Sequence, residues 1–278
     1  MTSVSIIVPV YNVERYIVDC ARSALSQTWQ DIQFIFVDDA SPDKSIDILE
    51  ELIDKEFQAR KPQISIIRKK VNEGLPQARR TGVEAATGDY ILHLDSDDWL
   101  ELDAVEKLVR RADETGADVV YFFAWKEFGE GRRRMITDKE FATPQEFADA
   151  AFVHKAHPGV VLKMWRRSLF TPPIFFPKYG NHEDTVQTLQ LLSHARTLAL
   201  LPEPVYHYRR TDGAAMSRKS RKVRRPLSLR NFLDLYIYYK DSLETSPIKR
   251  YYRRLLFKAR LWSLLYDRGA RKEYPGLL

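Results

Sequence analysis

Five short runs rich in apolar and β-branched residues recur along the first half of the chain, and segments of helical length separate them. The runs are residues 4–10, 32–37, 64–67, 90–94 and 119–123. Strands that are apolar throughout are buried on both faces, and helical connections make neighbouring strands parallel. The pattern therefore predicts an α/β fold with a doubly wound, mainly parallel sheet. Ligands of such sheets bind beyond the carboxyl ends of the strands.

The first two intervening segments carry helix signals. Residues 14–27 place four apolar side chains on one helical face: Ile17, Ala21, Ala24 and Leu25. In the next segment Ser41 precedes Pro42, which predicts an N-cap followed by a proline at the first helical position. Both segments are expected to be crossover helices.

Three carboxylates follow the run at residues 90–94 within four positions: Asp95, Asp97 and Asp98. Carboxylates this close repel one another unless a cation joins them. Mg²⁺ and Mn²⁺ prefer oxygen ligands and keep coordination positions open for water and substrate phosphates. The cluster therefore predicts a divalent cation, Mn²⁺ or Mg²⁺, that holds a phosphate or diphosphate substrate.

The other strand ends carry side chains suited to a nucleotide. Tyr11 can present its ring to a base, Asp39 can accept a hydrogen bond from a base N–H, and Arg79 can pair with phosphate. Neither common glycine-rich phosphate loop, G-x-x-x-x-G-K-[ST] or G-x-G-x-x-G, occurs in the sequence. The metal and the arginine are expected to replace it.

The 278-residue chain has one cysteine, Cys20, which cannot form an internal disulfide, so a reducing compartment is expected. The apolar run at residues 4–8 is too short for a signal peptide and lacks a basic leader. No stretch of about 18 apolar residues occurs anywhere. These features predict a cytoplasmic protein that does not span a membrane.

The net charge of +6 conceals two regions of opposite sign. Residues 218–272 contain seventeen Lys and Arg against four Asp and Glu, a net charge of +13, which leaves about −7 for the rest of the chain. Such segregation predicts a functional boundary near Ser217. The basic segment could contact anionic lipid, nucleic acid or the acidic body itself.

Four ordered segments of the chain resemble the family 2 glycosyltransferases of the GT-A fold. They are VSIIVPVYN at residues 4–12, VDDASPD at 37–43, NEGLPQAR at 72–79 and LDSDDW at 94–99. The Glu183-Asp184 pair and YHYR at residues 206–209 extend the similarity to about residue 217. The resemblance implies inverting transfer of one sugar from a nucleotide diphosphate donor, usually UDP-linked, to an acceptor hydroxyl, with a divalent cation.

On the donor side, the resemblance assigns a role to each matched residue. It implies a uracil pocket lined by Pro9, Tyr11 and Asp39, and it places Arg79 near the base or the diphosphate. The ribose would be held by Asp95 and Ser96. Two alternatives remain for these residues: Arg79 could be a surface helix residue, and Asp39, like Asp38, could cap the following helix.

On the metal and acceptor side, the resemblance implies that Asp97 binds the metal, that Asp184 is the general base, and that Glu183 shapes the acceptor site. A base is needed because the acceptor hydroxyl loses its proton as it attacks the anomeric carbon. His207 either completes the metal shell or is a buried, hydrogen-bonded histidine. Trp165 either stacks on an acceptor sugar or packs in the core.

Two further alternatives concern the acidic residues. Asp98 is expected to cap a helix that begins near Glu101, outside the metal site. Glu183 and Asp184 could instead be an acidic pair that interacts with the dipole of a helix N-terminus. Retention of configuration would require a carboxylate nucleophile near the anomeric carbon, and no motif suggests one, so inversion is predicted.

The predicted organisation is a GT-A domain at residues 1–217 and a basic amphipathic helical extension at 218–278. Within the domain, residues 1–99 form the nucleotide-sugar half and 100–217 the acceptor half. Helical patterns run from Phe232 to Leu243 and from Tyr252 to Leu265. Such helices can lie on an anionic membrane surface, as a peripheral enzyme of lipid-linked glycan synthesis would require, or pack on the catalytic domain or another subunit.

Two other classes of function are alternatives. A nucleotidyltransferase that activates a sugar phosphate shares an α/β sheet and an acidic metal site, but it requires a phosphate loop after the first strand. A nucleic-acid binder could use the basic extension with its interleaved tyrosines. That function leaves the strand-end motifs without a purpose, so a glycosyltransferase acting on a growing glycan is the prediction.

Overall fold

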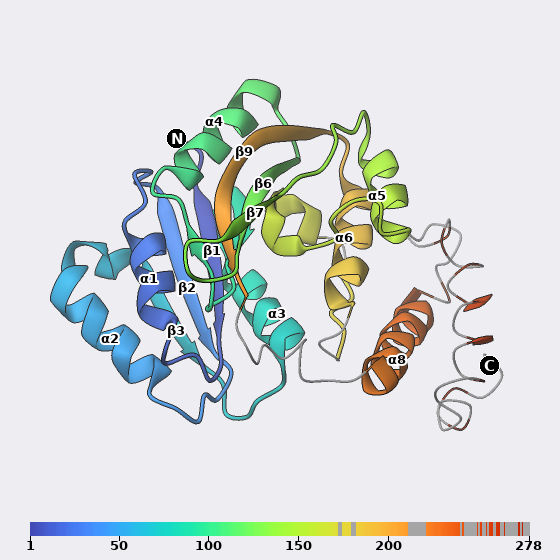
Figure 1. Ribbon diagram of the computed structural model, residues 1–278, viewed down its shortest axis with the longest axis horizontal. Helices are drawn as coiled ribbons and strands as arrows, with labels where there is room; N and C mark the ends of the chain where they lie inside the picture. Colours follow the sequence, from blue (N-terminus) through green and yellow to red (C-terminus); the bar gives the residue numbers. More distant parts are fainter. Residues whose placement is uncertain are drawn as a thin grey trace.

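The computed structural model describes residues 1–171, 174–178, 182–210 and 221–239, and after these positions 241, 249, 251, 254, 256, 257, 260, 261, 264, 272 and 274. Within this part of the chain nine strands form one sheet, in the order β3-β2-β1-β4-β8-β6-β9-β5, with β7 paired to β6 (Figure 1). The strands are β1 (Val4–Val10), β2 (Ile32–Asp38), β3 (Ile64–Arg68), β4 (Tyr90–His93), β5 (Trp99–Leu100), β6 (Val119–Glu127), β7 (Arg133–Ile136), β8 (Lys163–Arg166) and β9 (Leu198–Arg209).

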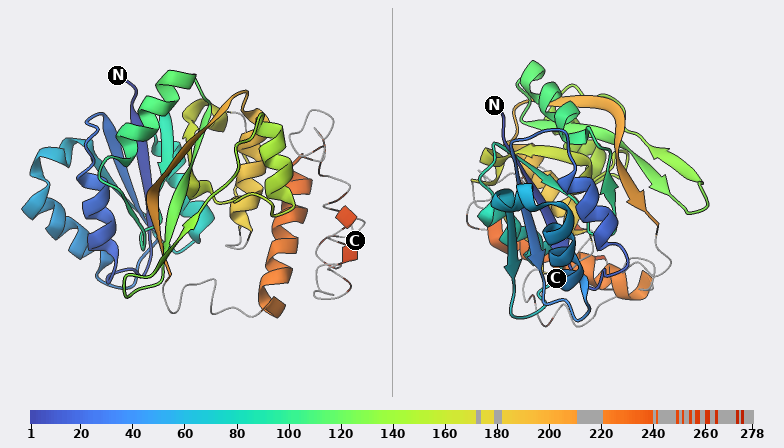
Figure 2. Two further views of the ribbon diagram at one scale, coloured as in Figure 1. Left: turned by 45° about the horizontal axis from the view of Figure 1, so that its top comes forward. Right: turned by 90° about the vertical axis from the view of Figure 1, so that its left-hand side faces the viewer.

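Helices pack against both faces of the first four strands (Figure 2). The α-helices are α1 (Ile17–Leu25), α2 (Ser45–Glu56), α3 (Leu75–Ala85), α4 (Ala104–Thr115), α5 (Pro144–Phe152), α6 (Glu183–His194) and α8 (Arg221–Tyr239). The short 3₁₀ helices are η1 (Gln58–Gln63), η2 (Val160–Leu162) and η3 (Arg167–Phe170).

Alternate residues of β1 enter two separate clusters. Ile6 and its even-numbered neighbours pack with α1 and α2, whereas Ile7 packs with Ala78 of α3. Parallel pairing joins β1 to β2, β2 to β3 and β1 to β4. The predicted doubly wound, mainly parallel sheet is confirmed, and all five predicted strands are present.

The start of α2 differs from the prediction, because the helix begins at Ser45 rather than near Pro42. The N-cap is Lys44, and Ser41 and Pro42 lie before the helix. The Asp43 carboxylate accepts the Ser45 N–H at 3.1 Å and the hydroxyls of Ser41 and Ser45. These hydrogen bonds link the preceding turn to the first residue of the helix.

The second part of the sheet interleaves strands from the later sequence. β8 pairs antiparallel with β4 and with β6, so β6 runs parallel to β4, and β9 is parallel to β6. The carboxyl ends of β1, β2, β4, β6 and β9 therefore lie at one edge of the sheet. The predicted halves at residues 1–99 and 100–217 share this single sheet.

The described part of the basic extension packs on the body. α8 lies beside α6, with Leu233 and Leu235 buried, and the Tyr239 hydroxyl donates to Gln190 Oε1 at 2.9 Å (Figure 1). Tyr251 stacks near Phe152 of α5. Ser217, most of the second predicted helix and Leu243 lie outside the described residues. Among the described helices, none is both long and apolar enough to cross a membrane.

Candidate functional site

The residues expected to bind the base lie at the adjacent ends of β1 and β2. Pro9 is buried within β1, whereas Tyr11, just beyond the strand, leaves 45% of its surface exposed. Asp39 directly follows β2, and its backbone N–H donates to the Val10 carbonyl oxygen at 3.0 Å. An exposed ring and a carboxylate are thus brought together at this edge.

The Asp39 carboxylate fastens the loop before α3 to this edge. One oxygen accepts the N–H of Glu73 at 3.0 Å and the other accepts the N–H of Gly74 at 2.7 Å. Asp39 therefore does not cap α2. The oxygen bound by Glu73 also lies 3.2 Å from Lys69 Nζ, so the oxygen bound by Gly74 is the one that retains a second lone pair for a base N–H. Asp38 instead closes its own turn by accepting the Ser41 N–H at 2.8 Å.

The three clustered acids differ in their surroundings. Asp98 is buried and accepts the Tyr206 hydroxyl at 2.6 Å and the Arg209 N–H at 2.7 Å. It anchors β9 and does not cap the helix after Glu101, which corrects the prediction. Tyr206 and Arg209 were missed as supporting residues, since only the folded sheet brings them to the acids.

Asp97 is the predicted metal ligand, and its electrostatic surroundings suit a cation. Burial and the nearby Asp95 carboxylate raise the pKa of Asp97 to about 6. Ser96, between them, is also buried. Among the described residues no three His, Cys, Asp or Glu side chains are grouped closely enough to hold a metal ion.

Arg79 joins the acid cluster to the predicted base. Its guanidinium is 1% exposed and donates to Asp95 at 2.7 Å through one nitrogen and to Asp184 at 2.8 Å through another. Burial alone would lower the pKa of Arg79, but the Asp95 and Asp184 carboxylates raise it above its ordinary value. Arg79 is therefore a permanent cation inside the site, and it is not a surface helix residue.

Asp184 and Glu183 begin α6 but face different surroundings. The Asp184 side chain is 32% exposed, so its second oxygen is accessible. Glu183 is buried, and desolvation together with the Asp184 charge raises its pKa to about 7. Gly180 and Asn181 of the same motif lie outside the described residues. Of the pair, Asp184 is the more exposed carboxylate.

A family model, "Glycosyl transferase family 2", matches residues 5–192, which span the strand-end residues, Arg79 and both acids of α6. The chain belongs to glycosyltransferase family 2. Among curated relatives it is similar to EpsH of Bacillus subtilis (strain 168), with 33% identity over 80% of this chain and 64% of EpsH. The glycosyltransferase EpsJ of the same strain is 31% identical over 74% of this chain and 60% of EpsJ. The chain thus spans less than two thirds of either relative.

Solved structures confirm the GT-A fold of this family 2 chain. TarS residues 1–349 from S. aureus, in complex with UDP-GlcNAc, superpose with a TM-score of 0.69 at 21% identity, over 84% of this chain and 67% of that one. The mannosyltransferase PcManGT from Pyrobaculum calidifontis, in complex with GDP-Man and Mn²⁺, gives a TM-score of 0.61 at 16% identity, over 97% and 74%.

Both ring nitrogens of His207 lie at hydrogen-bond distance from a carboxylate. Nδ1 lies 2.8 Å from Glu127 and Nε2 lies 2.9 Å from Glu101, while the ring stacks on Trp99 with centroids 4.8 Å apart. Its neighbour Tyr206 points to Asp98, and successive strand residues face opposite sides of a sheet. The arrangement matches the hydrogen-bonded alternative, and metal binding by His207 would require it to leave these partners.

Trp165 does not belong to the site. It lies in β8, is 0% exposed, and donates its indole N–H to the Val160 carbonyl oxygen at 3.1 Å. No face of the ring is open to a sugar, so the core alternative is correct. Apolar periodicity was too weak in this region to show that Trp165 lies on a central strand.

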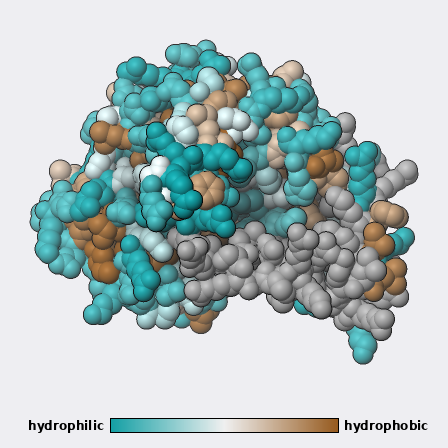
Figure 3. Space-filling view, in the orientation of Figure 1, coloured by the Kyte–Doolittle hydropathy of each residue, from teal (hydrophilic) through white to brown (hydrophobic). Residues whose placement is uncertain are grey.

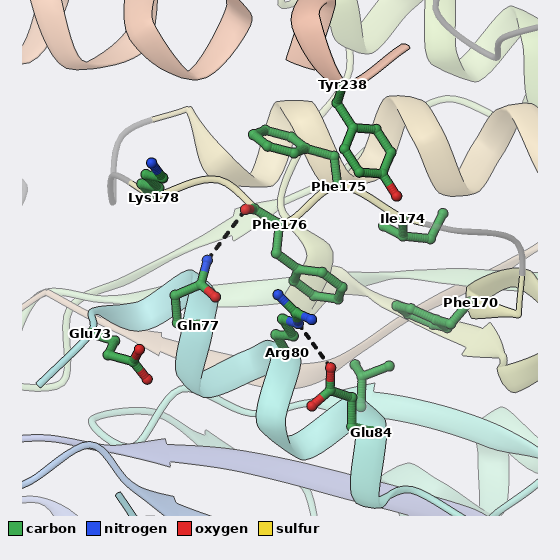
Figure 4. A pocket seen from close by; sticks show the side chains of 11 residues that line it. Glu73, Gln77, Arg80, Glu84, Phe170, Ile174, Phe175, Phe176, Lys178 and Tyr238 are labelled. Carbon is green, nitrogen blue, oxygen red and sulfur yellow. Dashed lines mark hydrogen bonds and ion pairs between the residues drawn. The ribbon is translucent and has the colours of Figure 1, made fainter. Parts of the chain in front are cut away.

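A cavity of about 830 Å³ lies between α3, the segment before α6 and α8 (Figure 4). Gln77 donates to the Phe176 carbonyl oxygen at 3.3 Å, and Arg80 pairs with Glu84 at 2.8 Å. Figure 4 shows the Phe176 ring beside Arg80, with the Tyr238 hydroxyl directed towards the cavity. Aromatic walls with a few polar groups are typical of small-molecule sites. α8 contributes to this wall, so the extension forms part of the surface next to the site.

Proposed function

We propose that the chain is an inverting glycosyltransferase that moves a hexose or N-acetylhexosamine from a UDP-sugar to a hydroxyl of a growing glycan. The observation that carries the proposal is the Arg79 bridge, because it brings Asp95 of the donor side and Asp184 of the acceptor side to one guanidinium. Family membership and the UDP-GlcNAc complex of TarS support this assignment.

In the proposed reaction Asp184 accepts the proton of the acceptor hydroxyl through its free oxygen while Arg79 fixes the other one. A general base of this kind contributes typically about 10²- to 10⁴-fold in rate. Asp39 and Tyr11 hold the base, and Asp95 and Ser96 hold the ribose. A divalent cation on Asp97 would neutralise charge on the departing diphosphate.

Glu183 has a different role in the proposal. Burial and the Asp184 charge raise its pKa to about 7, and with 9% of its surface exposed it offers an acceptor little access. It shapes the acceptor side by supporting the first turn of α6. Neither a nucleotidyltransferase nor a nucleic-acid binder explains why an exposed carboxylate is held beside the acid cluster.

We further propose that the glycan is a cell-surface polysaccharide or a lipid-linked oligosaccharide assembled at the cytoplasmic face of the membrane. Similarity to the minor teichoic acid biosynthesis protein GgaB of Bacillus subtilis (strain 168), at 29% identity over 76% of this chain and 23% of GgaB, supports the polysaccharide class. The proposal leaves the extension two roles, as a wall of the cavity between α3 and α8 and as a peripheral membrane contact.

Calorimetric titration of UDP, GDP, CDP and ADP, each with and without Mn²⁺, tests the donor assignment. Wild-type protein is expected to bind UDP only with the metal, and Asp97→Ala is expected to lose that binding. If GDP alone bound in the presence of Mn²⁺, the proposed donor would be a GDP-sugar instead of a UDP-sugar. Failure of all four nucleotides to bind would refute it.

A further inference from the structure

The hairpin formed by β6 and β7 projects from the ligand edge of the sheet (Figure 2, right). β6 ends at the same edge as β1, β2 and β4, and its neighbour β9 ends with Arg209, whose N–H binds Asp98. The hairpin is therefore continuous with the acid cluster. In Figure 3 the most hydrophilic colours gather near the centre of the face, over the part that Figure 1 labels β7.

Strand alternation shows which side of the hairpin faces the acids. On β9 the Tyr206 hydroxyl binds Asp98, and Tyr208, two residues on, faces the same side. Burial and the carboxylates of Asp98 and Asp95 raise the pKa of Tyr208, in keeping with that placement. On β6 Lys126 pairs with Tyr208, and its Nζ lies 5.7 Å from the Tyr208 ring centre.

Two cations stand directly opposite each other on this side. Lys126 of β6 is the cross-strand partner of Arg134 of β7. Like charges in such a pair destabilise a sheet. A third cation, Arg210, lies with its guanidinium 5.7 Å from the Phe128 ring centre, and Lys126 lies 5.9 Å from the same ring. We call this set, Lys126, Phe128, Arg134, Tyr208 and Arg210, the hairpin cation surface.

Within the described part of the chain, these three cations have no carboxylate at ion-pair distance. The nearby Arg132 approaches Glu130 at 3.6 Å, and exposed cations on α4 pair in the ordinary way, as Arg110 does with Glu106. Aromatic rings take the place of acids beside Lys126 and Arg210. The surface therefore keeps its positive charge, although it borders the acid cluster.

We propose that the hairpin cation surface binds a phosphate group carried by the acceptor, at a distance from the hydroxyl that receives the sugar. This inference rests on the proposed function, since it concerns the acceptor of that reaction. Three cations around two aromatic rings suit a multiply charged anion, and Arg and Lys both bind phosphate through charge-assisted hydrogen bonds. Bound phosphate would also relieve the repulsion between Lys126 and Arg134.

Calorimetric titration of the full chain with inorganic tripolyphosphate, in EDTA so that no metal recruits the anion to the acid cluster, tests the proposal. Lys126→Gln and Arg134→Gln are each expected to weaken binding by about threefold to tenfold. The matched control is Arg133→Gln, because Arg133 also lies on β7 but packs at 4.0 Å over Trp125 on the opposite side. Its affinity for tripolyphosphate is expected to equal that of the wild type.

Two outcomes would overturn the proposal: no tripolyphosphate binding by the wild type, or an equal loss of binding in the Arg133→Gln control. Binding to phosphatidylglycerol vesicles, but not to tripolyphosphate, that depends on Lys126 and Arg134 would make the surface a membrane contact instead. Mn²⁺-dependent UDP binding by each variant is measured in parallel. Failure of the wild type to bind any of the four nucleoside diphosphates with Mn²⁺ would refute the proposed function, independently of the tripolyphosphate result.

Discussion

Arg79 contacts one carboxylate of the predicted donor side, Asp95, and one of the predicted acceptor side, Asp184. The motif predicted that Arg79 contacts a phosphate or a base. In the structure its guanidinium is buried and pairs with the carboxylates of Asp95 and Asp184. Buried charges are tolerated when paired, and removal of one partner leaves the others uncompensated. Arg79 is thus a positioning residue for Asp95 and Asp184, and its planar fork is what allows one side chain to reach both.

Arg79→Lys is expected to lower the free energy of unfolding by about 2–4 kcal/mol, because an ammonium cannot serve both carboxylates from this position. Urea denaturation measures the change. Arg80→Lys is the control, since Arg80 is exposed in a pair with Glu84 and its replacement should cost less than about 0.5 kcal/mol. Equal effects of the two changes would contradict the buried bridge.

Asp184→Asn is expected to reduce kcat by at least about 100-fold while UDP binding with Mn²⁺ stays near the wild-type value, since a missing base affects the transition state. Glu183→Gln is the comparison, and its kcat should fall less. Steady-state transfer kinetics and UDP calorimetry give both quantities. Transfer by Asp184→Asn at the parent rate would show that another group is the base.

Glu183 makes stability depend on pH. Its folded pKa of about 7 exceeds the ordinary glutamate value of 4.5, so the folded state retains a proton that the unfolded state releases. The free energy of unfolding should therefore fall as the pH rises from about 4.5 to 7. Glu183→Gln should flatten this decline and gain about 1–3 kcal/mol relative to wild type at pH 8. Urea denaturation at pH 5 and pH 8 provides the check.

At the scale of the elements, the packing of α3 against β1 depends on a small residue, Gly82. A Cβ at Gly82 would lie 2.3 Å from Ile7 Cγ2 on β1, so glycine permits the close approach of helix and strand. Gly82→Ala is expected to destabilise the fold by about 1–3 kcal/mol. Combining it with Ile7→Ala removes the clashing methyl group, and the double mutant should cost less than the sum of the single changes. Additive losses in thermal unfolding would contradict this packing.

The sequence was sufficient for the first four strands, for α1 and for the mainly parallel, doubly wound character of the sheet, because apolar runs and helical periodicity repeat regularly there. It failed where tertiary contacts decide the outcome. Asp98 was expected to act locally, yet its partners come from β9, more than a hundred residues away. Trp165 carried no local sign of its place on β8, and the opposition of Lys126 and Arg134 depends on the register of the hairpin.

For the whole molecule, the extension is a structural part of the body as far as it is described. α8 buries Leu233 and Leu235 against it, and Tyr251 reaches Asp149 on α5 at 3.0 Å. This packing favours the body-contact alternative for that part and leaves the boundary near residue 217 a prediction. It also means that part of the apolar face of the extension is not available to a membrane.

A chain ending at residue 217 is expected to be less stable than one ending at residue 239, because each buried leucine of α8 contributes about 1.5–3 kcal/mol. Thermal unfolding of both truncated chains and the full chain measures the difference. The chain ending at 239 retains α8 and serves as the control. Identical transition midpoints for the two truncated chains would show that α8 is dispensable.

The Arg79 bridge also restricts how this chain can be recombined with its relatives. A chimera that takes residues 1–99 from one relative and the rest from another inherits Arg79 and Asp95 from one parent and Asp184 from the other. Donor and acceptor specificities are then exchangeable only between parents whose three side chains share one geometry. In a mismatched chimera the buried guanidinium would lack one of its two carboxylate partners, so the incompatibility would already affect folding, before any sugar is bound.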